Sequence, residues 1–305
     1  MKTDLGLLLN IHFRTLLNPD RKMTKLRQLQ LKCLEMLDVV DRICKEHNIK
    51  YSLCGGSVVG AHLYNGVLPW DDDIDLMMTR ENYNQFLSIA EKELPKGYSI
   101  HNYQNSDLST TLGFNYTKIF DDSTTFVQTN GKVMGIFIDI TVYDKVPENI
   151  LKYIDLFLYR RAMTINRGKL PGYSPKNIIR NFLLDTIFSN RRRYLKFAQR
   201  IIERIANRSS HYTYRELFGC FYNINMIPYN PSIFENYSSI EFEGRTVMIV
   251  RDYIEYLQTR YNRTDFREPE EMQVPTHYKY VNFDLPYKEY LRNNTQTKET
   301  PLKDI

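Results

Sequence analysis

The fold is decided by residues 69–76, which read PWDDDIDL and follow a glycine turn at residues 55–57, GGS. Four carboxylates within five residues repel one another unless a cation or solvent relieves the repulsion. From Asp73 onward acidic and apolar residues alternate, which predicts a strand with Asp73 and Asp75 on one face and apolar residues in a core on the other. Such a strand is a platform for a hard divalent cation, because these ions take oxygen ligands.

The alternative interpretation of an aspartate cluster is a solvated acidic turn, and we assign Asp71 and Asp72 to it. Asp73 and Asp75 differ because apolar residues flank them and a glycine turn precedes them. Residues 57–64 are predicted to form a helix whose N-terminus lies just behind the glycines. Free backbone N–H groups there would point at an anion. A cation platform beside an anion site predicts metal-dependent phosphoryl transfer.

A third acidic candidate lies in the apolar run 135–142, GIFIDITV. Alternation places four aliphatic side chains on one face of this predicted strand and Asp139 on the other. A lone Asp in such a strand is costly unless it is paired or bound to metal. We therefore predict Asp139 as the third metal ligand, with a salt-bridged strand acid as the alternative.

Composition is that of a globular protein, with 42% hydrophobic and 25% charged residues over 305 positions. This length is enough for a substantial core in one large domain or two small ones. No segment reaches the roughly 18–20 apolar residues that span a bilayer. The four cysteines lack CxxC spacing and are expected to be free thiols in a reducing compartment. We expect a cytoplasmic protein, with peripheral contact at the inner face of the membrane.

That contact is assigned to the basic region, residues 152–208, which contains fourteen Lys or Arg and three acidic residues. Such an excess suits an anionic partner: a membrane surface, a phosphorylated substrate or a nucleic acid. A solvated basic face is the alternative. Against nucleic acid, the arginine runs lack the glycine and aromatic interleaving of common RNA-binding motifs, so we expect no nucleic-acid partner.

The remaining pattern predicts an α+β fold, a mixed sheet core flanked by helices with an additional basic helical region. Helices are predicted at 26–47, 57–64, 80–94 and 250–261, and strands at 49–53, 98–103, 113–120 and 135–142, with a hairpin at 240–249. We divide the chain into an N-terminal segment (1–24), a catalytic core (25–150), a helical and C-terminal part packed on it (151–290) and a disordered tail (291–305).

A glycine-serine turn, an alternating acidic strand and a later single Asp together look like the nucleotidyltransferase fold of the DNA polymerase β type. The fuller string is more specific, with GGSVVGA at 55–61 and GVLPWDDDID at 66–75. It resembles the LicD family of phosphocholine transferases, whose signature reads close to GGTLLGA and GFIPWDDDIDI. The resemblance continues in residues 80–86, 118–125, 135–140 and 252–261.

The resemblance implies transfer of a phospho-alcohol, typically phosphocholine from a CDP-alcohol donor, onto a hydroxyl of a glycan or lipid-linked sugar acceptor. Asp73, Asp75 and Asp139 would be catalytic and hold Mg²⁺ or Mn²⁺, and Asp139 would also accept the proton of the attacking hydroxyl. The diphosphate would lie on the glycine turn. Its residues are Gly55, Gly56 and Ser57. Lys118 would steady a phosphate, with an ordinary surface lysine as the alternative.

The chain departs from the family pattern at two places. Family members commonly carry Arg-His between the glycine turn and Pro-Trp, where this chain has Leu63 and Tyr64. A late His-His is reduced to His277-Tyr278, and His277 keeps a role in binding acceptor or phosphate. Trp70 is expected to pack behind the acidic strand. A second enzymatic interpretation keeps the fold and transfers NMP from an NTP to a sugar or small molecule.

Overall fold

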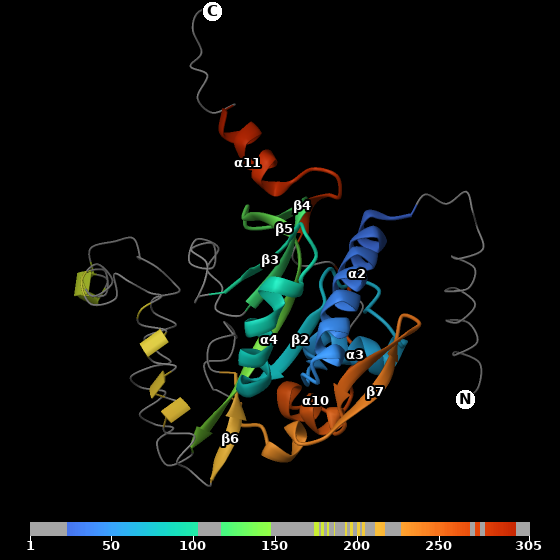
Figure 1. Cartoon of the computed structure of the whole chain (residues 1–305), viewed down its shortest axis with the longest axis vertical. Coiled ribbons are helices and arrows are strands. Elements are labelled where there is room, and N and C mark those ends of the chain that lie inside the picture. Colours follow the sequence, from blue (N-terminus) through green and yellow to red (C-terminus); the bar gives the residue numbers. More distant parts are fainter. Residues whose placement is uncertain are drawn as a thin grey trace, which may run out of the picture.

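One mixed sheet with helices around it makes up the centre of the molecule (Figure 1). In the computed structural model, the described residues are 23–102, 117–147, 211–216, 227–268, 272–274 and 278–296, with separate positions between 174 and 204. The strands are β1 (Ser52–Leu53), β2 (Asp75–Thr79), β3 (Tyr98–His101), β4 (Thr117–Gln128), β5 (Val133–Pro147), β6 (Tyr212–Arg215), β7 (Tyr237–Phe242), β8 (Arg245–Val250) and β9 (Tyr278–Asn282). The helices are α2 (Lys25–Glu46), α3 (Gly55–Tyr64), α4 (Arg80–Glu93), α10 (Tyr253–Tyr261), α11 (Tyr287–Gln296) and the short 3₁₀ helix η3 (Pro231–Phe234).

The strand order in the main sheet is β1-β2-β5-β4-β3, with β6 paired to β5 and β9 paired to β4. The β2–β5 pair is parallel, and the other pairs in this sheet are antiparallel. The two remaining strands, β7 and β8, form a separate hairpin. The α+β class with a mixed sheet, predicted from the sequence, is confirmed.

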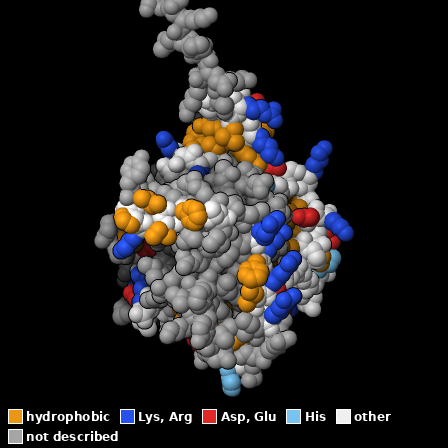
Figure 2. Space-filling view, turned by 90° about the vertical axis from the view of Figure 1, so that its left-hand side faces the viewer, with side chains coloured by type: hydrophobic (Ala, Val, Ile, Leu, Met, Phe, Trp, Pro, Cys, Tyr) orange, Lys and Arg blue, Asp and Glu red, His pale blue; other side chains and the backbone are white. Residues whose placement is uncertain are grey.

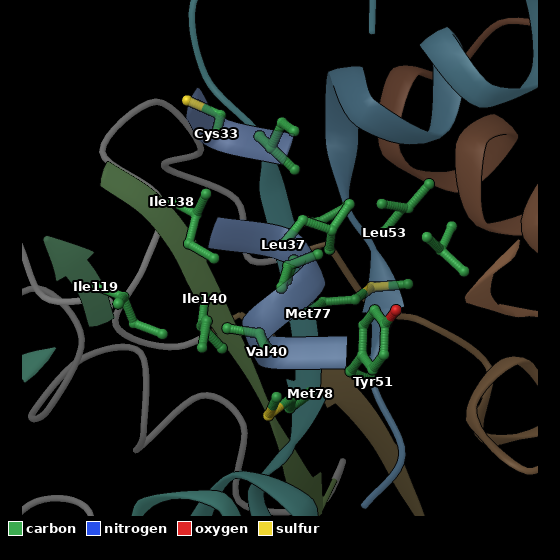
Figure 3. Packing of buried hydrophobic residues seen from close by; sticks show 14 of the residues in the cluster. Cys33, Leu37, Val40, Tyr51, Leu53, Met77, Met78, Ile119, Ile138 and Ile140 are labelled. Atoms are coloured by element: carbon green, nitrogen blue, oxygen red, sulfur yellow. The ribbon is translucent and has the colours of Figure 1, made fainter. Parts of the chain in front are cut away.

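Helix α2 covers one face of this sheet, and α4 lies beside it (Figure 1). The Thr24 side chain caps the N-terminus of α2 by accepting a hydrogen bond from the Arg27 backbone N–H at 3.2 Å. Its apolar stripe packs on the sheet, and Figure 3 shows Leu37 and Val40 beside Ile138 and Ile140. Asp139 lies between those two isoleucines, so its side chain is on the face opposite α2.

The C-terminal half of the chain adds strands to the sheet that the N-terminal half begins. Strands β6 and β9 pair with β5 and β4, and α10 packs against α3. The β7–β8 hairpin is joined to α2 by two ion pairs, Arg27–Glu243 at 2.7 Å and Arg245–Asp38 at 2.7 Å. Among the described residues, we find no helix with the length and hydropathy of a membrane-spanning segment.

Several predicted bounds change. Strand β1 has two residues, and α3 begins at Gly55, so the glycines are its first turn. Strand β4 runs on to Gln128, past the predicted end at 120. The tail predicted to be disordered from residue 291 is helical up to Gln296, because the preceding aromatic residues of α11 pack on β4 and β5.

Candidate active site

Three carboxylates meet where the parallel strands β2 and β5 run side by side. Asp75 is the first residue of β2 and is the register partner of Asp139 on β5. Asp73 lies two residues before Asp75, and the intervening Ile74 is fully buried. Carboxylate oxygens of Asp73, Asp75 and Asp139 all lie within 4.8 Å of one another. The structure thus brings together the three acids that the sequence predicts as metal ligands.

The acids destabilise one another in the absence of a cation. Burial raises the pKa of Asp75 well above its usual value, and the charges of Asp73 and Asp139 raise it further. Arg260 and Lys118 act in the opposite direction. An all-oxygen donor set whose repulsion still raises the pKa of Asp75, with two cations nearby, fits a hard divalent cation such as Mg²⁺. Asp73, Asp75 and Asp139 are the residues that would hold it.

Lys118 lies beside this cluster, on β4 directly opposite Asp139. Its Nζ donates to both carboxylate oxygens of Asp139, at 2.7 and 2.8 Å, and its side chain is 2% exposed. Asp139 is therefore salt-bridged, as the alternative interpretation expects, and is also part of the acidic cluster. Any further ligand of Asp139, whether a proton or a cation, would share these oxygens with Lys118.

Comparison with known proteins places this site in a family. The family described as "LicD/FKTN/FKRP, nucleotidyltransferase domain" matches residues 48–171. The chain is 28% identical over 280 residues to the lipopolysaccharide cholinephosphotransferase LicD of Haemophilus influenzae, covering 84% of this chain and 97% of that protein.

Residues 48–171 are a LicD-family domain. The resemblance drawn from the glycine turn and the acidic strand is confirmed. An uncharacterized protein of Rickettsia prowazekii is 22% identical over 165 residues, which cover 53% of this chain and 58% of that protein. The family match at residues 48–171 includes the three acids, Lys118 and the glycine turn.

The glycine turn of this LicD-family domain is already engaged in internal hydrogen bonds. The Gly55 N–H donates to the Tyr256 hydroxyl at 3.1 Å, and the Ser57 N–H donates to the Cys54 carbonyl at 3.0 Å. The Ser57 hydroxyl accepts from the Asp75 N–H at 2.9 Å, which ties α3 to the acidic strand. The predicted diphosphate cradle is therefore partly used by the protein to hold Asp75 in place.

The acids before Asp73 are not simply a solvated turn. Asp72 is 1% exposed, and its carboxylate accepts a hydrogen bond from the Tyr278 N–H of β9 at 2.8 Å. The prediction of a solvated position was wrong for Asp72, because a distant strand covers it. Carboxylate oxygens of Asp71, Asp72 and Asp73 also lie within 4.8 Å of one another. His277, the predicted acceptor-binding residue, lies outside the described residues.

At the first departure from the family pattern, Leu63-Tyr64, the chain has an aromatic contact. Tyr64 is 39% exposed and meets Trp70 edge to face, with ring centroids 5.8 Å apart. The Trp70 indole N–H donates to Glu268 at 3.1 Å. Trp70 thus packs at the start of the acidic segment and is also fixed by a hydrogen bond.

Sequence reasoning missed the second cation of the site, Arg260 near the end of α10. A Cβ atom built on Gly55 would lie 3.6 Å from the Arg260 Nε and 3.6 Å from an Asp75 carboxylate oxygen. One feature of the sequence could have indicated Arg260: it is a basic residue in a helix whose core-facing residues are otherwise tyrosines and a leucine. Only the folded chain shows that this helix packs on α3.

Proposed function

We propose that this protein is a Mg²⁺-dependent transferase that moves phosphocholine from CDP-choline onto a hydroxyl of a cell-surface glycan or its lipid-linked precursor. The observation that carries the proposal is the meeting of Asp73, Asp75 and Asp139 within 4.8 Å. The likeness to a lipopolysaccharide cholinephosphotransferase over 84% of the chain supports both the transferred group and the acceptor class.

The residues of the site would have different roles in such a transfer. A divalent cation held by Asp73, Asp75 and Asp139 would supply charge neutralisation for the transferred phosphoryl group and the leaving CMP. Ser57 holds Asp75 through its backbone N–H, and Lys118 holds both oxygens of Asp139. These contacts fix the acids before substrate arrives, which lowers the reorganisation that the reaction requires.

Turnover of a panel of CDP-alcohols tests the proposal. Purified protein, Mg²⁺ and a cell-wall glycan extract would be incubated with CDP-choline, CDP-ethanolamine, CDP-glycerol or CDP-ribitol, and CMP release would be scored. We expect release from CDP-choline above the others, and its loss on removal of Mg²⁺ or in Asp73→Ala and Asp75→Ala. CMP release that survives the loss of both carboxylates would refute the metal site.

The second candidate is transfer of NMP from an NTP to a sugar or small molecule. The family description, which names a nucleotidyltransferase domain, is the observation that favours it. The two activities need the same acids and differ in product. Pyrophosphate release from an NTP, with no CMP released from any CDP-alcohol, would select this candidate.

We also propose that the basic region, residues 152–208, contacts an anionic membrane surface. Its described side chains include large apolar residues that are more than half exposed: Ile178, Ile179, Phe182 and Phe197. Lys176, Arg193, Arg200 and Arg204 are exposed beside them in the sequence. Figure 2 views this side of the molecule and shows Lys and Arg side chains close together as well as exposed hydrophobic side chains. Apolar insertion combined with cationic attraction is how peripheral helices bind anionic lipid.

Liposome flotation tests the membrane contact. Wild-type protein should float with anionic vesicles at low salt and less with neutral vesicles, and Phe182→Ser with Phe197→Ser should reduce flotation. Absence of flotation with anionic vesicles at low salt would refute the contact and leave the transferase proposal standing.

A further inference from the structure

Arg260 brings a cation to the edge of the acidic cluster. Its Nε and Nη2 atoms and an Asp75 carboxylate oxygen all lie 3.6 Å from the position that a Cβ atom on Gly55 would occupy. The guanidinium, the carboxylate and the first residue of α3 thus converge on one point. The Arg260 side chain is 22% exposed, so part of it reaches the surface while most of it is packed.

The two edges of the Arg260 guanidinium have different surroundings. The Nη1 atom donates to Glu216 at 3.2 Å and lies 3.5 Å from the Tyr143 hydroxyl. The edge formed by Nε and Nη2 is the one nearest to Gly55 and Asp75. One edge therefore anchors the arginine in the protein, and the other is presented at the site.

Helix α10 supplies both Arg260 and the group that holds Gly55. Tyr256, one helical turn before Arg260, accepts the Gly55 N–H at 3.1 Å and lies 3.2 Å from the Cys54 sulfur. The pKa of Arg260 is held well above its usual value, by Tyr256 first and also by Tyr143 and Glu216. The guanidinium is a permanent positive charge in a fixed position.

We propose that Arg260 is a phosphate-binding residue of this site, whose Nε and Nη2 edge binds the diphosphate of the nucleotide donor. The planar guanidinium edge offers two parallel N–H donors, which match two oxygens of a phosphate. A position beside Asp75 places this edge next to the predicted cation. Arginine and cation would then share the diphosphate charge. The assignment of the diphosphate to a CDP-alcohol rests on the proposed function.

Titration calorimetry with Arg260→Gln tests the assignment without relying on turnover. CDP-choline, CTP and inorganic pyrophosphate would each be titrated with Ca²⁺ in place of Mg²⁺ to suppress the reaction. A charge-assisted pair of hydrogen bonds to phosphate predicts a loss of affinity of about 10- to 100-fold for the ligands that bind wild type. Arg260→Lys should lose less affinity, because it keeps the positive charge and loses only the pair of parallel N–H donors. Arg245→Gln, at a half-buried arginine of the β7–β8 hairpin paired with Asp38, is the matched control and should bind as wild type does.

Two outcomes would refute a phosphate-binding role and replace it with a structural one. In the first, Glu216→Ala, which removes the anchor and keeps the arginine, lowers the melting temperature and the affinity as much as Arg260→Gln does. In the second, Arg260→Gln changes the binding of Mn²⁺ alone and leaves the affinity for all three ligands unchanged. Arg260 would then only balance the charge of the acids.

The ligand panel separates this inference from the proposed function. Wild-type binding of CDP-choline that is equally tight in Arg260→Gln refutes the role of Arg260 and keeps the transferase proposal. Binding of CTP alone, weakened in Arg260→Gln, keeps Arg260 and refutes the CDP-alcohol donor. Failure of wild type to bind any of the three ligands refutes both.

Discussion

Strand β5 carries two buried acids, five residues apart, that each meet one cation, and they have different surroundings. Asp144 accepts from the Arg80 Nε at 2.7 Å and from its Nη2 at 3.0 Å, in a pair whose side chains are 3% and 8% exposed. Asp139 accepts from Lys118 at 2.7 and 2.8 Å, in a pair exposed by 9% and 2%. By exposure and distance alone the two pairs are nearly the same.

The difference lies in what else the acid faces. Arg80 begins α4, and its Nε and Nη2 donate to both oxygens of Asp144. Glu203 lies 3.9 Å from the same Nε, but its side chain is 32% exposed, so the two buried charges of Arg80 and Asp144 balance. Asp139 faces Asp75 across the parallel register and Asp73 beside it. Two cations, Lys118 and Arg260, therefore face three carboxylates. A buried pair that balances is a structural element, whereas a buried pair inside an excess of acid marks a place for a further cation.

The largest expected effect is on catalysis, from Asp75→Asn. The substitution keeps the backbone N–H that donates to Ser57 and removes one ligand charge. Loss of metal-assisted charge stabilisation, worth several kcal/mol, predicts a fall of about 10³-fold or more in the rate of CMP release. Burial and the neighbouring acids raise the pKa of Asp75, so its ionised form is costly, and the metal-free variant should be at least as stable as wild type.

The measurement is the initial rate at saturating Mg²⁺, together with thermal unfolding in EDTA. A variant that stays folded and retains wild-type activity would show that Asp75 is not a ligand. A variant that unfolds in EDTA would show that its charge is stabilising, contrary to the direction of its pKa.

The next effect is on stability, from Asp144→Ala. Removing Asp144 takes both short hydrogen bonds from the buried Arg80 guanidinium and leaves the partly exposed Glu203 3.9 Å away, which predicts a loss of about 3–5 kcal/mol in the free energy of unfolding. The rate per folded molecule should be unchanged, because Asp144 lies outside the acidic cluster. Urea unfolding and activity at low temperature measure the two quantities. A loss of rate without a loss of stability would remove the distinction between the two pairs.

A smaller effect is expected in the stabilisation of the folded state by Mg²⁺, which should depend on Asp75 and should not depend on Asp144. A ligand at about one hundred times its Kd stabilises the folded state by about 2.7 kcal/mol. We expect this increment in wild type and in Asp144→Ala, and none in Asp75→Asn, by thermal unfolding with and without Mg²⁺. An equal increment in all three proteins would locate the cation elsewhere.

The sequence correctly predicted those helices, breaks and hairpins that depend on residues close together in the chain. The periodicity of α2, the break after His47 and the hairpin around Gly244 were predicted within a few residues. The alternation at residues 73–76 correctly separated the buried Ile74 from the half-buried acids. A helix was predicted to begin at Arg80, and α4 begins there.

The errors occur where distant segments decide the outcome. The polar residues after Phe120 read as the end of a strand, yet β4 continues because Asp121 is paired by Lys32 from α2 and a register shift absorbs the irregularity. Asp72 is buried because strand β9, some two hundred residues later, covers it and donates a backbone N–H to its carboxylate. Arg260 enters the site from an equally distant helix. No window along the chain contains both members of these contacts, so periodicity cannot reveal them.

The smallest expected effect is the one that compares the two cations directly, Lys118→Met with Arg80→Met as its matched control. Each substitution keeps an unbranched, apolar side chain and removes the buried positive charge, so both variants should be destabilised in EDTA by several kcal/mol. In Lys118→Met, Asp139 is left facing Asp73 and Asp75, and Mg²⁺ should stabilise this variant by about 1 kcal/mol more than it stabilises wild type. In Arg80→Met the increment should equal that of wild type, because Asp144 is out of reach of the cation. Thermal unfolding of the three proteins with and without Mg²⁺ measures the increments. If both variants gain equally from Mg²⁺, Lys118 is no closer to the cation than Arg80 is, and Asp139 would be a strand acid whose pairing is complete without metal.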